Sequence, residues 1–187
     1  MNRLPTLRAV VVAVLLCGGL AAGGCTRSFH LSTLPHDERA RIAEIVLAVA
    51  EAPQEVPPET RREVWAILRA HGQPSADNRR ELAGILYRIG QGTRLFWLDA
   101  QQAVASGHPV KSDARTQWEA DLLKEHWLSP IQQHRYDDLM EKISRQEPIE
   151  SSHGVEISLN ESMARAIVES WSDTELRSAI DQLLTPP

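Results

Sequence analysis

A repeated apolar spacing is the feature of this chain that most restricts its fold. Apolar residues recur at i, i+3, i+4 and i+7, the period that places them on one face of an α-helix. Serine, proline and glycine, which begin and end helices, separate these stretches. The stripes span residues 42–49, 64–71, 82–89, 136–143, 164–171 and 176–183, and a related helical spacing of i, i+4, i+5 and i+9 spans residues 118–127. The pattern predicts an all-α fold.

Capping signals mark the ends of these helices. A helix N-cap is favoured by serine, and a Glu or Gln three residues later completes a capping box. The sequence offers such boxes at Ser129–Gln132, Ser158–Glu161 and Ser172–Glu175, and single caps at Ser75 and Ser112. No repeat of fixed period appears, so a solenoid is not supported. We predict an irregular bundle of about seven helices in a single domain, residues 34–187.

Two segments do not follow a simple helical reading. The pattern of residues 76–105 predicts one long helix, and Gly90-Gln91-Gly92 predicts a kink or break within it. The segment 148–158 is the least helical, and at its end Val155, Ile157 and the following Leu159 alternate with polar residues, as in a β-strand. Because no partner strand is apparent, we expect a short extended connector near residues 155–159, with a short β-bridge as the alternative.

The N-terminus has the order of a secretory signal. Arg3 and Arg8 precede an apolar run at residues 9–16, and small residues follow. The run is short for a membrane-spanning helix, which needs about 20 apolar residues. Residues 1–24 are therefore predicted to be a signal peptide.

The stretch Leu20-Ala21-Ala22-Gly23-Gly24-Cys25 resembles the lipobox of bacterial lipoproteins. It departs from the commonest pattern at Ala22, where leucine is most frequent. The resemblance implies cleavage before Cys25 and attachment of diacylglyceryl and a further acyl chain, such as palmitate, to that residue. Thr26, by similarity to enterobacterial sorting, implies the outer membrane. An ordinary cleaved signal peptide and a retained anchor helix remain as alternatives.

The predicted mature protein is a lipidated cysteine, a short tether and the helical domain. Residues 25–33 form the cysteine and tether, and the eight residues after Cys25 reach at most about 26–29 Å. Removal of residues 1–24 takes away two arginines, so the formal charge falls from −5 to −7. No basic stripe is present, which disfavours nucleic-acid binding. The lipid alone is expected to hold the protein on its membrane.

Metal ligation is one alternative function. His126 and His134 flank the Ser129-Pro130 turn, so the fold can bring them together, and zinc or copper accepts such ligands. The spacing of the seven histidines matches no established metal motif. These two histidines are the candidate metal ligands.

A peptidoglycan-cleaving enzyme is the second alternative. Residues Glu161-Ser162-Met163-Ala164-Arg165-Ala166 slightly resemble the catalytic segment of lytic transglycosylases, which include helical outer-membrane lipoproteins. The resemblance implies that Glu161 acts as acid and base in a sugar-binding cleft. The Gly-Ala-x-Gly-Leu-Met-Gln stretch of that family is absent, and Glu161 is also explained by its capping box.

The main expectation is a non-enzymatic, lipid-anchored module without a cofactor, which binds or assembles with another envelope protein. It would lie at the periplasmic face of the outer membrane. Phe96 and Trp97, adjacent aromatic residues on the long helix, are the candidate partner-binding residues. The predicted mature domain resembles no particular family.

Overall fold

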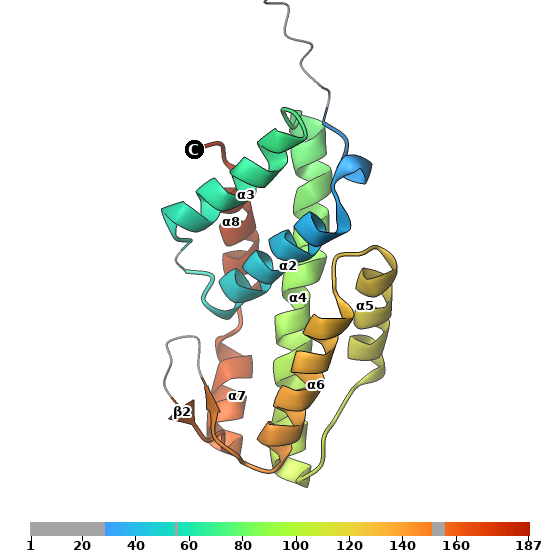
Figure 1. Cartoon of the computed structure of the whole chain (residues 1–187). Coiled ribbons are helices and arrows are strands. Elements are labelled where there is room, and N and C mark those ends of the chain that lie inside the picture. Colours follow the sequence, from blue (N-terminus) through green and yellow to red (C-terminus); the bar gives the residue numbers. More distant parts are fainter. Residues whose placement is uncertain (1–28, 55, 151–155) are drawn as a thin grey trace, which may run out of the picture.

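The protein is described by a computed structural model that covers residues 29–54, 56–150 and 156–187. The predicted signal peptide and Cys25 lie outside the described residues. Helices dominate the described part of the chain, so the predicted all-α bundle is confirmed (Figure 1). The elements are η1 (Leu31–Thr33), α2 (His36–Glu51), α3 (Pro58–Ala70), α4 (Ala76–Ser106), α5 (Asp113–Lys124), α6 (Pro130–Ser144), β1 (Ile149–Glu150), β2 (Glu156–Ile157), α7 (Glu161–Ser170) and α8 (Asp173–Leu184).

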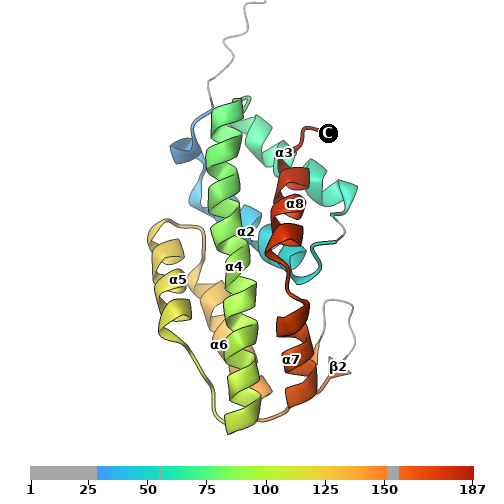
Figure 2. The same ribbon diagram turned by 180° about the vertical axis from the view of Figure 1, so that it is seen from behind.

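Helix α4 is the axis of the fold. It runs the length of the domain, and α2, α5, α6, α7 and α8 all pack against it (Figures 1 and 2). Its 31 residues span about 46 Å at 1.5 Å per residue. The first half of α4 shares a core with α2, α3 and α8, which includes Ile42, Leu82 and Leu176. The second half shares another with α6 and α7, which includes Phe96 and Ile143.

Helix α4 is continuous through Gly90-Gln91-Gly92, so the predicted kink or break is wrong. The glycines instead let neighbouring helices approach. A Cβ atom at Gly92 would lie 1.9 Å from Cζ2 of Trp118 on α5, and one at Gly90 would lie 2.8 Å from Cδ1 of Leu176 on α8. Glycine is therefore needed at these two positions for close packing between helices, which the local sequence does not reveal.

Several helix ends follow the capping signals. Ser75, Ser112, Ser129 and Ser172 are the N-caps of α4, α5, α6 and α8. The box at Ser129–Gln132 is present in both directions. The box at Ser158–Glu161 was predicted wrongly, because α7 begins two residues later. There Asn160 is the N-cap, and its side chain accepts a hydrogen bond from the Met163 N–H.

A small hairpin replaces the predicted unpaired connector. Strand β1 pairs with β2 in an antiparallel register that places Ile149 opposite Ile157. The partner strand was missed because it is only two residues long and directly follows Pro148, so it shows no alternation of its own. Ile149 is buried against the second core, which fixes the hairpin to the bundle.

No helix in the described ranges combines the length and apolar character needed to cross a bilayer.

Candidate functional site

A groove of about 350 Å³ lies between α2 and α6. Each helix contributes one face, with its residues spaced i, i+3, i+4 and i+7. The lining residues are Glu44, Leu47, Ala48 and Glu51 from α2, and Gln132, Arg135, Tyr136 and Leu139 from α6. The groove is thus an apolar surface two turns long with a few polar groups, the usual composition of a small binding site.

The sequence of α2 explains why this face is open. Most of the circumference of α2 is buried, with Ile42, Val46 and Ala50 fully inside the core. The remaining face carries Ala48, whose small side chain leaves room beside α6, and Glu51, which is exposed at the helix end. Burial of the rest of the helix therefore fixes the direction in which Glu51 points.

Tyr136 forms the inner wall of the groove. Its ring packs on Phe96 of α4, with ring centroids 5.3 Å apart. Burial raises the pKa of the Tyr136 phenol, and the nearby Glu51 charge raises it further. The hydroxyl therefore stays neutral at physiological pH, as a hydrogen-bond donor and acceptor.

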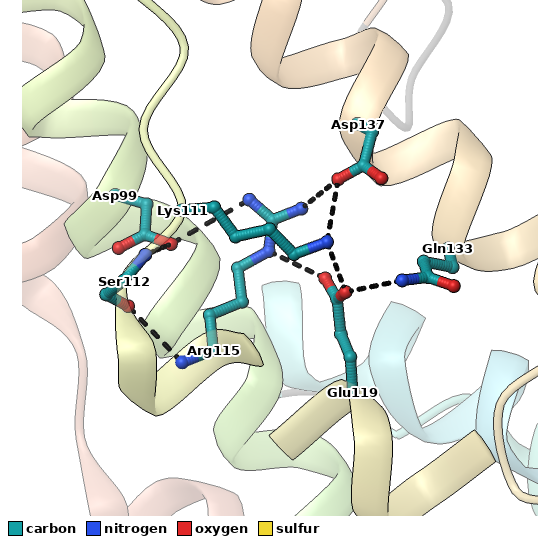
Figure 3. A network of polar contacts seen from close by, with 7 residues as sticks. All are labelled: Asp99, Lys111, Ser112, Arg115, Glu119, Gln133 and Asp137. Atoms are coloured by element: carbon teal, nitrogen blue, oxygen red, sulfur yellow. Dashed lines mark hydrogen bonds and ion pairs between the residues drawn. The ribbon is translucent and has the colours of Figure 1, made fainter. Parts of the chain in front are cut away.

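A largely buried ionic network joins α4, α5 and α6 (Figure 3). At its centre is the Arg115 side chain on α5, only 1% exposed. Its Nε donates to Glu119 Oε1 at 2.9 Å, and its Nη2 donates to Asp137 Oδ1 on α6 at 3.0 Å. Its Nη1 lies 3.8 Å from Asp99 Oδ2 on α4. The arginine therefore links three helices.

Other groups complete the bonding of the two buried carboxylates. The Ser112 N–H donates to Asp99 Oδ2 at 3.1 Å, and Gln133 Nε2 donates to Glu119 Oε2 at 3.0 Å. Lys111 Nζ lies 2.6 Å from Glu119 Oε2. Burial alone lowers the pKa of Lys111, but its ion pairs with Glu119 and Asp137 outweigh this effect and raise it. Because these ion pairs join residues of α4, α5 and α6, we interpret the network as a scaffold that holds the three helices together.

Glu51 is different from these carboxylates. Within the part of the chain that the structure describes, it forms no hydrogen bond and no ion pair. Desolvation by the surrounding groups raises the pKa of its carboxyl. On the opposite rim, the exposed Arg135 also has no ion-pair partner among the described residues. Judged by residues 29–54, 56–150 and 156–187, the groove therefore carries one acidic and one basic side chain without an ion-pair partner.

The two candidate metal ligands contact different neighbours. The His126 ring stacks on that of His36, with centroids 3.7 Å apart and an angle of 10° between the planes. The His134 side chain is 77% exposed, and its Nε2 lies 3.6 Å from Asp138. Over residues 29–54, 56–150 and 156–187, no group of three His, Cys, Asp or Glu has a metal-binding arrangement.

Glu161, the candidate catalytic residue, is the first residue of α7. Its side chain is 57% exposed, and its Oε1 accepts a hydrogen bond from Arg165 Nη2 at 2.9 Å. It does not line the α2–α6 groove. Its surroundings resemble a solvated helix start, where a carboxylate also interacts favourably with the helix dipole.

The two candidate partner-binding aromatics differ in exposure. Phe96 is 4% exposed and lies in the second core, whereas Trp97 is partly buried. Trp97 packs edge-on against Phe96 and lines a cavity of about 50 Å³ together with Glu51 and Trp171. The apolar spacing of residues 136–143 places Tyr136 and Leu139 on one helical stripe, but nothing in the sequence predicts the groove itself.

Comparisons with protein-family models, curated proteins and solved structures gave no significant match to this chain.

Proposed function

We propose that this protein is a lipid-anchored module that binds or assembles with another protein at the periplasmic face of a bacterial outer membrane, without catalysing a reaction. The observation that carries the proposal is the Leu20–Cys25 stretch, which resembles a lipobox and lies directly before the folded domain. The α2–α6 groove, whose Glu51 carboxylate has no ion-pair partner within the described ranges, supports a binding role.

The anchor would hold the domain very close to its membrane. Phe29 is only 2% exposed, so the chain joins the core four residues after Cys25. Four residues reach at most about 14 Å, about half of the length expected for the whole tether. The described chain begins at the end of the molecule where α4 begins and α8 ends (Figure 1). This end would face the bilayer.

The mechanism of the module is tethering. A lipoprotein of this class carries more than one acyl chain, which gives stable attachment where one chain gives only marginal binding. Confinement to the membrane surface raises the effective concentration of the domain for a neighbouring envelope protein. Binding then needs only a modest intrinsic affinity.

The anchor is tested with Cys25→Ser in cells fed a labelled palmitate analogue. Cys17→Ser is the matched control, because it removes the other cysteine of the chain. We expect the wild-type and the control protein to be labelled, to fractionate with the outer membrane and to be cut in a globomycin-sensitive way. We expect Cys25→Ser to lose all three properties. A Cys25→Ser protein that is still labelled and sediments with the outer membrane would contradict the proposal.

A further inference from the structure

We propose that the α2–α6 groove binds a lysine side chain of the partner protein, with Glu51 as its counter-ion. This inference rests on the proposed binding function and names the chemistry of the partner. It depends on four features: the apolar floor, the unpaired carboxylate, the neighbouring phenol, and the distance of the groove from the anchored end.

The floor of the groove matches an aliphatic stem. Leu47 and Ala48 of α2 face Leu139 of α6 across it. Lysine commonly lays its four methylene groups along apolar surface while its ammonium group remains at a polar rim. A groove two helical turns long accommodates such a stem with the charge placed at the Glu51 end.

Of the two carboxylates that line the groove, Glu51 is the one without a cation partner in the described part of the chain. Arg41 Nη1 lies 3.2 Å from Glu44 Oε2, and Arg41 Nε lies 2.7 Å from Glu63 Oε1. Glu51 has no such partner among the described residues, and desolvation raises its pKa. An incoming ammonium group would stabilise the ionised form and form charge-assisted hydrogen bonds with it.

Tyr136 and Arg135 further restrict which kind of cation the groove can bind. The Tyr136 hydroxyl forms no hydrogen bond within the described ranges, and its phenol is close enough to Glu51 for that charge to raise its pKa. It therefore offers a second acceptor to an ammonium group, which has three donors. The guanidinium of Arg135 on the other rim repels a second positive charge, which favours a single lysine over a polybasic segment.

The place of the groove favours a protein lysine over the amine of a membrane lipid. The inner wall, Tyr136, packs on Phe96. Phe96 lies about 30 Å along α4 from Ala76, at 1.5 Å per residue. If the beginning of α4 faces the bilayer, a lipid headgroup in that bilayer does not reach Glu51. A neighbouring protein that projects from the membrane does.

The chemistry is tested by NMR titration of the purified full chain in detergent. The probe is N-acetyl-lysine-N-methylamide, and N-acetyl-norleucine-N-methylamide is its control with the same stem and no charge. We expect the lysine probe alone to shift the amide signals of Ala48 and Leu139. In Glu51→Gln, its affinity should fall about tenfold, the loss expected for a charge-assisted contact. Glu59→Gln, an exposed position on α3 that does not line the groove, should bind as the wild type does.

Equal shifts with norleucine, no shift with lysine, or an unchanged affinity in Glu51→Gln would overturn the proposal. Because this titration needs no membrane, its failure is distinguishable from failure of the anchor, which Cys25→Ser tests separately.

The source of the lysine is tested by zero-length carbodiimide cross-linking of intact cell envelopes. The reagent joins the Glu51 carboxyl to a contacting amine as an amide with loss of water. We expect mass spectrometry to find Glu51 joined to a lysine of another protein, and to find no such product in Glu51→Gln. The internal pair of Lys111 Nζ and Asp137 Oδ1, 3.2 Å apart, is the positive control. Two results would refute the proposed partner. One is detection of the Lys111–Asp137 product without any Glu51 product, and the other is Glu51 joined to an aminophospholipid.

Discussion

Alanine at Gly92 gives a sharp test of the packing around α4. In an exposed helix interior, replacing glycine by alanine stabilises a protein by about 1 kcal/mol. At Gly92, however, the new Cβ would lie 1.9 Å from Cζ2 of Trp118 and 2.4 Å from Cε2 and Cη2 of the same ring. These are atoms of a rigid indole, so the conflict is relieved only if Trp118 moves.

The expected magnitude follows from what Trp118 loses. Its Nε1 donates to the Arg88 carbonyl oxygen at 2.8 Å, and a displaced ring gives up this hydrogen bond at a cost of about 1 kcal/mol. Overpacking adds about 1–3 kcal/mol. After subtraction of the helix propensity gained, Gly92→Ala should destabilise the protein by about 1–3 kcal/mol.

The assay is urea unfolding followed by circular dichroism, with Gly84→Ala as the matched control in the same helix. A Cβ at Gly84 meets no atom within 4 Å, so this variant should be about 1 kcal/mol more stable than the wild type. Gly90→Ala should fall between the two, because its contact is the flexible end of Leu176. If Gly92→Ala proves as stable as Gly84→Ala, the proposed packing of α5 on α4 is wrong.

Three further predictions concern the network, a helix cap and the groove. Arg115→Met leaves two buried carboxylates without their central cation and should cost about 3–5 kcal/mol in urea unfolding; an unchanged stability would contradict the scaffold role. Ser129→Ala removes the capping box of α6 and should cost about 1 kcal/mol, whereas Ser178→Ala, inside α8, should cost little; equal losses would refute the capping argument. The Glu51 carboxyl should titrate above an ordinary glutamate by NMR, because desolvation raises its pKa. Since the pKa of Glu51 is higher in the folded than in the unfolded protein, the free energy of unfolding falls as the pH rises through the range in which Glu51 titrates. Glu51→Gln should remove that part of the pH dependence; an identical pH profile in the variant would exclude the raised pKa.

Helix ends were predicted well because their signals are local. Ser75, Ser112 and Ser129 accept hydrogen bonds from backbone N–H groups three residues later, so the residues that decide each end lie within one turn of it. At α7 the same logic erred only in which residue caps the helix, since Ser158 and Asn160 are both good N-caps. The number and class of helices therefore followed from the apolar period and the caps.

The groove and the network were not visible in the sequence because their members come from distant segments. Gln132 Nε2, for example, reaches the Ala40 carbonyl oxygen across 92 positions. Glu51 and Tyr136 approach each other only because α2 and α6 pack on the same helix, α4. Likewise, the i, i+4 spacing of Arg115 and Glu119 suggests an exposed pair. Burial of Arg115 is stabilised by the approach of Asp99 and Asp137, and burial of Glu119 by Lys111 and Gln133.

The amino-acid sequence by itself thus determined that the chain forms helices, where most of them begin and end, and that residues 1–25 resemble a lipoprotein signal. Only the tertiary structure decided that Gly90 and Gly92 make room for α8 and α5 rather than bend α4, and that Ile149 pairs with Ile157. It also decided that the Glu51 side chain lines a groove with no ion-pair partner among the described residues. The physical reason is range: turns and caps are fixed by neighbours within about four residues, whereas close packing depends on how whole helices cross.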